Sequence, residues 1–391
     1  MEEASSRFVQ NFGKLPKLYD IPPLFGIIQT EKKLGRKDDT PKKFRGLLTM
    51  HILDVLHIFV VLTILKLGHL GWLEVTVPAI FYQFIVAVNE ANMLVQGHTL
   101  YIEAKRINLI LREFRKLRNF VLSDQSVSKR STKPDELRDY NLSVKLWIYF
   151  LHFLAVNLAL TFLCVATVPL LGSIDTGYLL VTAVSLNSSN WADSLIGKTI
   201  RIIFSSLFSC HWYFVAITIF ISAIVTILLP SEILTILGNR SKLCKLTYES
   251  LRILIFRFNE TVKWVLAMEL LVISIMFVSS VYASLRLNDK MPLQTCIMFP
   301  IVAVLMVVAA VLIYSCGGKV LTRSEKYVEK WERIAKRDGG GGISGKVAIR
   351  VWRAVRPIGL EIGSFGSLPK MSILYLFEVW VEQTIALLLI E

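Results

Sequence analysis

The sequence MSILYLFEVWVEQTIALLLIE, residues 371–391, is an apolar segment of membrane-spanning length that carries acidic side chains. A helix needs about 20 predominantly apolar residues to cross a bilayer. Glu378 and Glu382 are four positions apart, so a helix places both carboxylates on one face. We therefore expect a membrane-spanning helix with a stripe that is acidic at one end and apolar at the other. The same face continues with Ala386, Leu389 and Ile390.

Carboxylates inside such a helix have to face protein or water. A carboxylate at the centre of a lipid-facing helix costs about 2.5–3.5 kcal/mol. One interpretation is that Glu378 and Glu382 pair with basic residues of cytosolic helices or lie at the membrane interface. The other is that their stripe, with Gln383, lines a pore shared by several subunits, where acidic rings concentrate cations and an apolar ring closes the path. Asp54 and Glu90 are further acids within apolar segments.

The composition of the 391-residue chain indicates an all-α, polytopic membrane protein. Hydrophobic residues make up 54% of the chain, charged residues make up 19%, and the mean hydropathy is +0.55. These values are unusual for soluble domains. The net charge of +14 does not indicate nucleic-acid binding, because the basic residues lie between apolar blocks. The sequence contains no paired metal-ligand motif and no nucleophile–base motif, so we expect neither a metal, nor a cofactor, nor enzymatic activity.

Seven apolar segments are long enough to span a membrane. We place the amino terminus in the cytosol and the carboxyl terminus outside, because all but five of the 44 Lys and Arg residues then lie on the cytosolic side. The fourth segment is expected to end at Pro230 and the sixth at Gly317 and Gly318. The segments are 47–67, 75–95, 146–171, 202–229, 265–285, 296–316 and 373–390.

This topology divides the chain into four parts: a cytosolic tail, six spans with helical cytosolic loops, a cytosolic loop with a Gly-rich linker and an anchor helix, and the seventh span. In the longest external loop, the N-x-S/T sequon at Asn187 is the expected glycosylation site. The sequons at Asn141, Asn239 and Asn259 are then chance matches. The four parts are residues 1–46, 47–316, 317–371 and 372–391.

The cytosolic loops contain amphipathic patterns. Two interpretations fit: helices that lie on the anionic inner leaflet, or cytosolic extensions of the spans that pack together. We favour the second, because three such helices would form a compact intracellular layer. The patterns cover residues 101–122, 234–265 and 321–337.

Aromatic residues are frequent in the outer halves of the predicted spans. Aromatic side chains are common in membrane cores and interfacial belts, which is one interpretation. The alternative is an apolar pocket that binds a small organic ligand with few polar groups to orient it. The candidate ligand-binding residues are Phe81, Tyr82, Phe84, Phe162, Phe208, Trp212, Tyr213, Phe277 and Tyr282.

The last forty residues, WRAVRPIGLEIGSFGSLPKMSILYLFEVWVEQTIALLLIE (352–391), carry a more specific pattern. Arg356-Pro357 and Gly363-Ser364-Phe365 precede the short seventh span. This ending resembles that of the insect chemoreceptor superfamily, which comprises odorant and gustatory receptors. When Gly363 is aligned with the family glycine, Glu382 and Gln383 occupy the positions of a Thr-Tyr pair that is frequent in the family. Leu389 and Ile390 then occupy the positions of a Gln followed by an aromatic residue or Leu.

The resemblance implies a ligand-gated, non-selective cation channel in the plasma membrane. Four subunits would surround one pore formed by the seventh spans, as a homotetramer or together with a co-receptor. Cytosolic helices would provide most of the contact between subunits, and a small organic tastant or odorant would bind among spans 2, 3, 4 and 6. The ending fits neither subfamily closely, and we expect a gustatory-like receptor.

Two other functions were considered. A metabotropic seven-span receptor would have the opposite orientation, and the sixth and seventh spans contain neither a Trp-x-Pro nor an Asn-Pro-x-x-Tyr motif. A transporter would be expected to contain inverted repeats and interrupted helices, and no such repeat is apparent. The sequence therefore favours a receptor channel.

Overall fold

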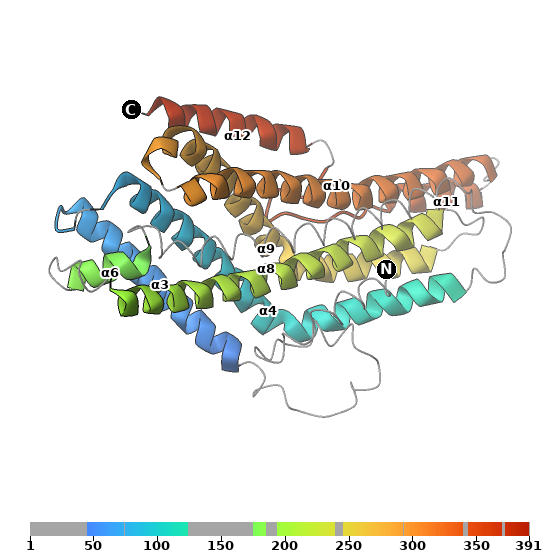
Figure 1. The fold of residues 1–391 in the computed structure, drawn as a ribbon. Helices are drawn as coiled ribbons and strands as arrows, with labels where there is room; N and C mark the ends of the chain where they lie inside the picture. Colours follow the sequence, from blue (N-terminus) through green and yellow to red (C-terminus); the bar gives the residue numbers. More distant parts are fainter. Residues whose placement is uncertain are drawn as a thin grey trace.

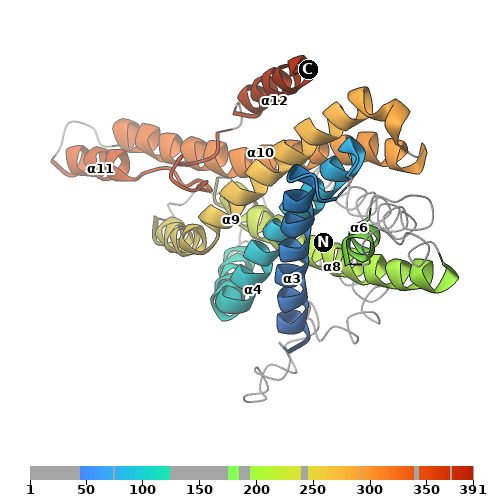
Figure 2. The same cartoon turned by 90° about the vertical axis from the view of Figure 1, so that its left-hand side faces the viewer.

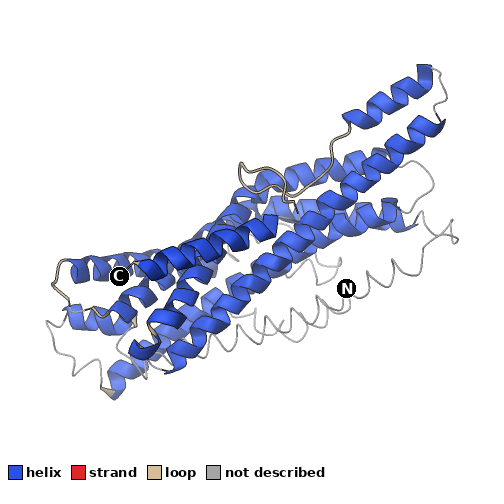
Figure 3. Ribbon diagram, turned by 90° about the horizontal axis from the view of Figure 1, so that it is seen from above, coloured by secondary structure: helices blue, strands red, loops and turns tan. Residues whose placement is uncertain are grey.

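The computed structural model describes residues 45–73, 75–123, 175–184, 194–238, 245–291, 293–338, 343–369 and 372–390. Every regular element within these ranges is a helix, and several of them run along the length of an elongated bundle (Figures 1 and 3). The elements are α3 (Arg45–His69), α4 (Val77–Ser123), α6 (Thr176–Val184), α8 (Leu195–Gly238), α9 (Lys245–Arg286), the 3-10 helix η4 (Asn288–Lys290), α10 (Leu293–Asp338), α11 (Ile343–Ala354) and α12 (Ser372–Leu389).

Four helices of the described part are long and apolar enough to cross a membrane: His51–His69, Lys245–Arg286, Phe299–Arg337 and Ser372–Leu389. They correspond to the first, fifth, sixth and seventh predicted spans. Helices α4 and α8 cover the second and fourth predicted spans. The third, residues 146–171, lies outside the described residues, as does the Gly-rich run 339–342.

The amphipathic patterns are continuous with the predicted spans. Helix α4 extends without interruption over the whole 101–122 pattern, and α9 begins at Lys245, well before the fifth predicted span. Helix α10 continues to Asp338. The prediction that these segments are helical extensions that pack together is therefore confirmed in the described part.

Helix α8 continues through Pro230, so the prediction that the segment ends there is wrong. Proline in a helix interior removes a backbone donor and costs about 3 kcal/mol. Just beyond it, the side chains of Ile233, Leu234 and Leu237 are fully buried. Arg323 also donates from Nη1 to the backbone carbonyl of residue 231 at 2.9 Å. Packing of the turns after the proline offsets its cost.

Helix α10 likewise continues through Gly317 and Gly318, which were predicted to end the sixth span. A Cβ atom at Gly317 would lie 2.8 Å from Cδ2 of Leu368. The glycine therefore lets the segment before α12 lie close against α10. The carbonyl of Gly318 accepts a hydrogen bond from Thr322 Oγ1 at 2.9 Å, as expected inside a helix. These glycines are a close-packing site and not a helix end.

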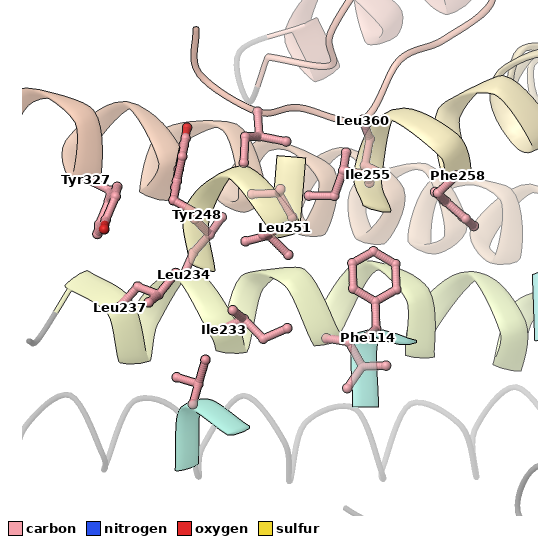
Figure 4. Close-up of a cluster of buried hydrophobic side chains, with 14 of the residues drawn as sticks. Phe114, Ile233, Leu234, Leu237, Tyr248, Leu251, Ile255, Phe258, Tyr327 and Leu360 are labelled. Carbon is pink, nitrogen blue, oxygen red and sulfur yellow. The ribbon is translucent and has the colours of Figure 1, made fainter. Parts of the chain in front are cut away.

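The largest buried core joins the extensions of α4, α8, α9 and α10 with α11 (Figure 4). Phe114 of α4, Leu237 of α8 and Leu251 of α9 are all fully buried in it. The 3.6-residue spacing of the apolar side chains on each helix produces this shared interior. The amphipathic patterns thus pack together in one layer in the described part of this chain.

Tyr248 places a polar group inside that core. Its ring stacks on Tyr327 with centroids 4.9 Å apart, and its hydroxyl lies 2.7 Å from Ser324 Oγ. Burial raises the pKa of the Tyr248 phenol to about 12. Ser324 Oγ also accepts a hydrogen bond from the backbone N–H of Ile358 at 2.6 Å. These contacts fix the chain where it leaves α11.

Helix α11 is also linked to α10 through charges at the surface. Glu332 Oε1 accepts hydrogen bonds from Arg353 Nε at 3.0 Å and from Lys336 Nζ at 2.8 Å. The hydrogen bonds from Lys336 and Arg353 lower the pKa of the Glu332 carboxyl.

Candidate functional site

The segment between α11 and α12 is fixed to α9 by the side chain of Asn259. Asn259 is 4% exposed. Its Nδ2 donates to the carbonyl of Gly359 at 3.0 Å, and its Oδ1 accepts from the backbone N–H of Glu361 at 3.3 Å. Because both ends of the amide are used, the match of Asn259 to a sequon is a chance one, as expected from the sequence.

Gly363, which carries the family resemblance, lies in the next turn of this segment. Its φ is +51°, and its N–H donates to the carbonyl of Lys263 at 2.8 Å. A Cβ atom there would lie 3.2 Å from Cζ3 of Trp264 and 3.3 Å from Cβ of Ala267. The position therefore requires glycine for its backbone conformation and for its close approach to α9. Phe365, by contrast, is 87% exposed.

Helix α12 lies at the outside of the bundle, against α9 and α10 (Figures 1 and 2). Only Trp380 and Thr384 of this helix are buried. The indole of Trp380 stacks on the ring of Phe277 of α9, with centroids 4.3 Å apart and planes at 21°. Near the end of α12, Arg286 of α9 donates from Nη2 to the carbonyl of Leu388 at 3.4 Å. The helix is thus attached along one side.

The other side of α12 is uncovered in the single chain. All six residues that the sequence placed at a pore or gate are exposed, although Gln383 lies nearer the attached side than Glu378 and Glu382 do, and Ile390 directly follows the helix. A helix turns by about 100° per residue, so Glu378 and Glu382 lie roughly opposite Trp380. The exposed fraction is 76% for Leu389 and 68% for Ile390. The uncovered residues are Glu378, Glu382, Gln383, Ala386, Leu389 and Ile390.

The sequence left open whether the two carboxylates pair with basic residues. Among the described residues, neither Glu378 nor Glu382 has a basic side chain within ion-pair distance.

The predicted ligand-binding aromatics are distributed over three places. Phe81 of α4 stacks on Tyr282 of α9, with centroids 5.1 Å apart. Phe277 instead contacts α12, as described above. Tyr82 is buried between α3, α4 and α6, while Phe84 is 42% exposed. Among the described members of the set, the structure therefore brings together one pair, Phe81 and Tyr282.

The remaining predicted site residues cannot be placed. Phe162 and Asn187 lie outside the described residues. Phe208, Trp212 and Tyr213 belong to α8, and their side chains also lie outside the description.

Buried polar groups connect α4, α6 and α8. Arg201 of α8 forms an ion pair with Asp175, just before α6, and both side chains are 2% exposed. The guanidinium of Arg201 also lies over the Tyr178 ring, 4.9 Å from its centroid. Thr176 Oγ1 donates to Gln83 Oε1 at 2.8 Å. These contacts hold α6 against the two longer helices.

Deeper in the bundle, acids pair with polar residues of neighbouring helices. Glu90 of α4, which the sequence singled out, contacts His57 of α3. Glu269 of α9 accepts hydrogen bonds from Asn92 Nδ2 at 3.1 Å and from Gln96 Nε2 of α4. Sequence reasoning missed Glu269, although a lone carboxylate inside the apolar run VLAMELLVIS signals an intramembrane partner.

No protein-family model matches the sequence, and no curated protein matches it. The structure is similar to that of the insect olfactory receptor OR5 from Machilis hrabei, with a TM-score of 0.60 and 12% identity over 92% of this chain and 93% of that one. A structure of OR5 in complex with eugenol gives a TM-score of 0.57 and 12% identity over 91% and 93% of the two chains. The similarity covers nearly all of both chains, and it confirms the fold that the resemblance in the last forty residues implied.

Proposed function

We propose that this chain, which has the fold of the insect olfactory receptors, is a chemosensory receptor and a subunit of a ligand-gated, non-selective cation channel. It would cross the plasma membrane seven times, with a cytosolic amino terminus and an external carboxyl terminus. The channel would be a tetramer of this chain or a tetramer that includes a co-receptor. Its ligand would be a small organic tastant or odorant.

The observation that carries the proposal is the one-sided attachment of α12. Trp380 and Thr384 hold one side of the helix against its own subunit, while Glu378 and Glu382 on the opposite side are uncovered. A membrane helix does not expose two carboxylates to lipid without a large cost. A water-filled pore between symmetry-related α12 helices gives these side chains an aqueous environment.

The pore would combine two kinds of ring. Carboxylates of Glu378 and Glu382 would attract cations and exclude anions. Toward the outside, Leu389 and Ile390 would form an apolar constriction that expels water when it is narrow. Displacement of α12 away from the axis would widen this constriction and admit hydrated cations.

Helix α9 would connect ligand binding to α12. Near its outer end, Tyr282 stacks on Phe81 of α4, in the region proposed to bind ligand. Less than two turns earlier, Phe277 stacks on Trp380 of α12. A shift at the first aromatic contact would be carried by the rigid helix to the second. This gives a physical connection between the proposed ligand site and the proposed pore.

The test is whole-cell current in cells that express the chain. We expect Glu382→Gln to reduce the preference for cations over anions, and Leu389→Ala to increase the current in the absence of ligand by about tenfold, since a loss of about 1.4 kcal/mol from the closed state has that effect. Glu329→Gln serves as the control, because Glu329 is an exposed acid in the cytosolic part of α10. If Glu382→Gln and Leu389→Ala both behave as the control does, the assignment of the pore to α12 is wrong.

The orientation has a separate test. An epitope tag at residue 391 should be stained on intact cells. Staining only after permeabilisation would support the metabotropic receptor topology instead.

A further inference from the structure

Helices α3 and α4 meet along a line of titratable side chains in the described part of the bundle. His51, Asp54 and His57 follow one another at three-residue spacing, so they occupy one side of α3. Asp54 is fully buried and His57 is 7% exposed. On α4, Glu90 is also fully buried. We call these four residues the α3–α4 seam.

Two contacts organise the seam. Nδ1 of His57 is in hydrogen-bond contact with Oε1 of Glu90. Nδ1 of His51 lies 3.6 Å from Oδ2 of Asp54, one turn away on the same helix. Gly97 of α4 makes room for His51, since a Cβ atom at this glycine would lie 2.0 Å from Cε1 of His51. The seam thus contains two acids and two imidazoles in two pairs.

The described surroundings of the His57–Glu90 pair contain both apolar and charged groups. Tyr82 of α4 faces the same interior, and the ring of Phe204 of α8 contacts His57 edge-on, with centroids 5.4 Å apart. Asp175 and Arg201 form an ion pair at the outer end.

Glu269 of α9 interacts instead with Asn92 and Gln96, and Asp54 and His51 are the remaining titratable neighbours among the described residues. The His57–Glu90 pair itself is neutral only when it holds one proton, on either the imidazole or the carboxyl.

We propose that the His57–Glu90 pair is a one-proton binding site that makes the packing of α3 against α4 depend on pH. A second proton would leave a net positive charge in the bundle interior, and loss of the shared proton would leave a negative one. Either charge is strongly disfavoured where water is excluded. Occupancy by a single proton thus stabilises the contact between the two helices, and the two titrate as a unit.

The direction of the pH dependence follows from proton counting. In the unfolded chain, an isolated glutamate binds a proton below about pH 4.3 and an isolated histidine loses one above about pH 6.5. Between these values the folded and unfolded states hold the same number of protons, and the contribution of the pair is complete. Above about pH 6.5 the unfolded state holds fewer protons, so stability falls as pH rises. Below about pH 4.3 it holds more, so stability falls as pH decreases.

Glu90→Gln reverses the trend near neutral pH. The glutamine amide can still donate to His57, but the imidazole then has to remain neutral to be buried. The unfolded state binds a proton to this histidine below about pH 6.5, so the variant loses stability as pH decreases. The difference in melting temperature between wild type and Glu90→Gln should therefore be largest near pH 5.5. We expect it to decrease by about 4 °C between pH 5.5 and pH 8.5.

The experiment is thermal unfolding of the purified full chain across that pH range. His69→Gln and His98→Gln are matched controls, because both histidines belong to the same two helices and are exposed. Their difference from wild type should not change with pH. A pH-independent difference for Glu90→Gln would overturn the proposal.

A second measurement uses the wild-type protein alone and keeps the test valid if Glu90→Gln does not fold. Amide hydrogen exchange of α3, corrected for the intrinsic pH dependence of exchange, should be less protected at pH 8.5 than at pH 6. The cytosolic half of α10 serves as the internal reference. Equal protection of α3 at both pH values, relative to that reference, would also overturn the proposal. Neither measurement requires the chain to conduct ions, so failure of the proposed function would leave this test intact.

Discussion

Asn259→Ala tests whether the amide of Asn259 fixes the chain that enters α12. The substitution removes the donor to the Gly359 carbonyl and the acceptor for the Glu361 N–H. The carbonyl lies in a buried hydrogen bond, and the N–H in a partly buried one. Leaving a buried polar group without its partner costs about 1–3 kcal/mol. We expect the variant to lose about 2–4 kcal/mol of unfolding free energy.

Thermal unfolding of the purified protein measures this loss. The entropy of unfolding grows with chain length, so for a chain of this size the loss corresponds to a decrease of about 2–5 °C in melting temperature. Asn259→Asp should destabilise the protein at neutral pH at least as much as Asn259→Ala, because it buries a carboxylate and places an oxygen against the Gly359 carbonyl oxygen.

Asn288→Ala is the matched control, since Asn288 is exposed in η4 at the other end of α9. Its melting temperature should stay within about 1 °C of wild type, as is usual for surface substitutions. If Asn259→Ala also melts within about 1 °C of wild type, the Asn259 contacts do not hold the segment, and the argument from its burial is refuted.

Three further predictions concern α9, α10 and the segment that follows α11, and thermal unfolding checks each of them. Gly363→Ala should cost about 1–3 kcal/mol, because alanine is strained at a φ of +51° and its Cβ would crowd Trp264; a melting temperature equal to wild type would contradict this. Wild type should lose stability relative to Tyr248→Phe between about pH 10 and pH 12. Burial raises the pKa of the Tyr248 phenol to about 12, so the phenol ionises first in the unfolded state. Parallel pH profiles of the two proteins would refute this prediction. Glu332→Gln should destabilise the protein slightly at pH 7, and this difference from wild type should disappear as pH falls below about 4. The reason is that Lys336 and Arg353 stabilise the ionised form of Glu332, which lowers its pKa. A difference in stability that persists at low pH would show that the charge of Glu332 is not its cause.

Hydropathy and helical periodicity were sufficient to predict the helical fold of the described part and the packed helical extensions, because apolar spacing decides which side of a helix is buried. They failed at Pro230 and at Gly317-Gly318. Local rules end a helix at such residues, but the buried side chains after Pro230 and the close approach of Leu368 to Gly317 override those rules. These are long-range contacts, which a local pattern does not contain.

For the candidate site, the i, i+4 spacing of Glu378 and Glu382 placed both carboxylates on one side of a helix, and both are exposed on α12, while their role at a pore stays a prediction. The aromatic set was less predictable, since abundance of aromatics does not specify partners: Phe277 contacts Trp380, while Phe81 contacts Tyr282. The partners of buried polar groups could not be read from the sequence either. His57 and Glu90 are 33 positions apart, and only the packing of α3 against α4 brings them together.

The central claim is that the uncovered side of α12 faces a water-filled axis shared by four subunits. Imaging the purified full-length protein as single particles tests this directly. The account predicts fourfold symmetry, with α12 nearest the axis and with Glu378, Glu382 and Leu389 directed toward it. A monomeric particle, or an assembly in which α12 faces lipid at the periphery, would contradict the claim.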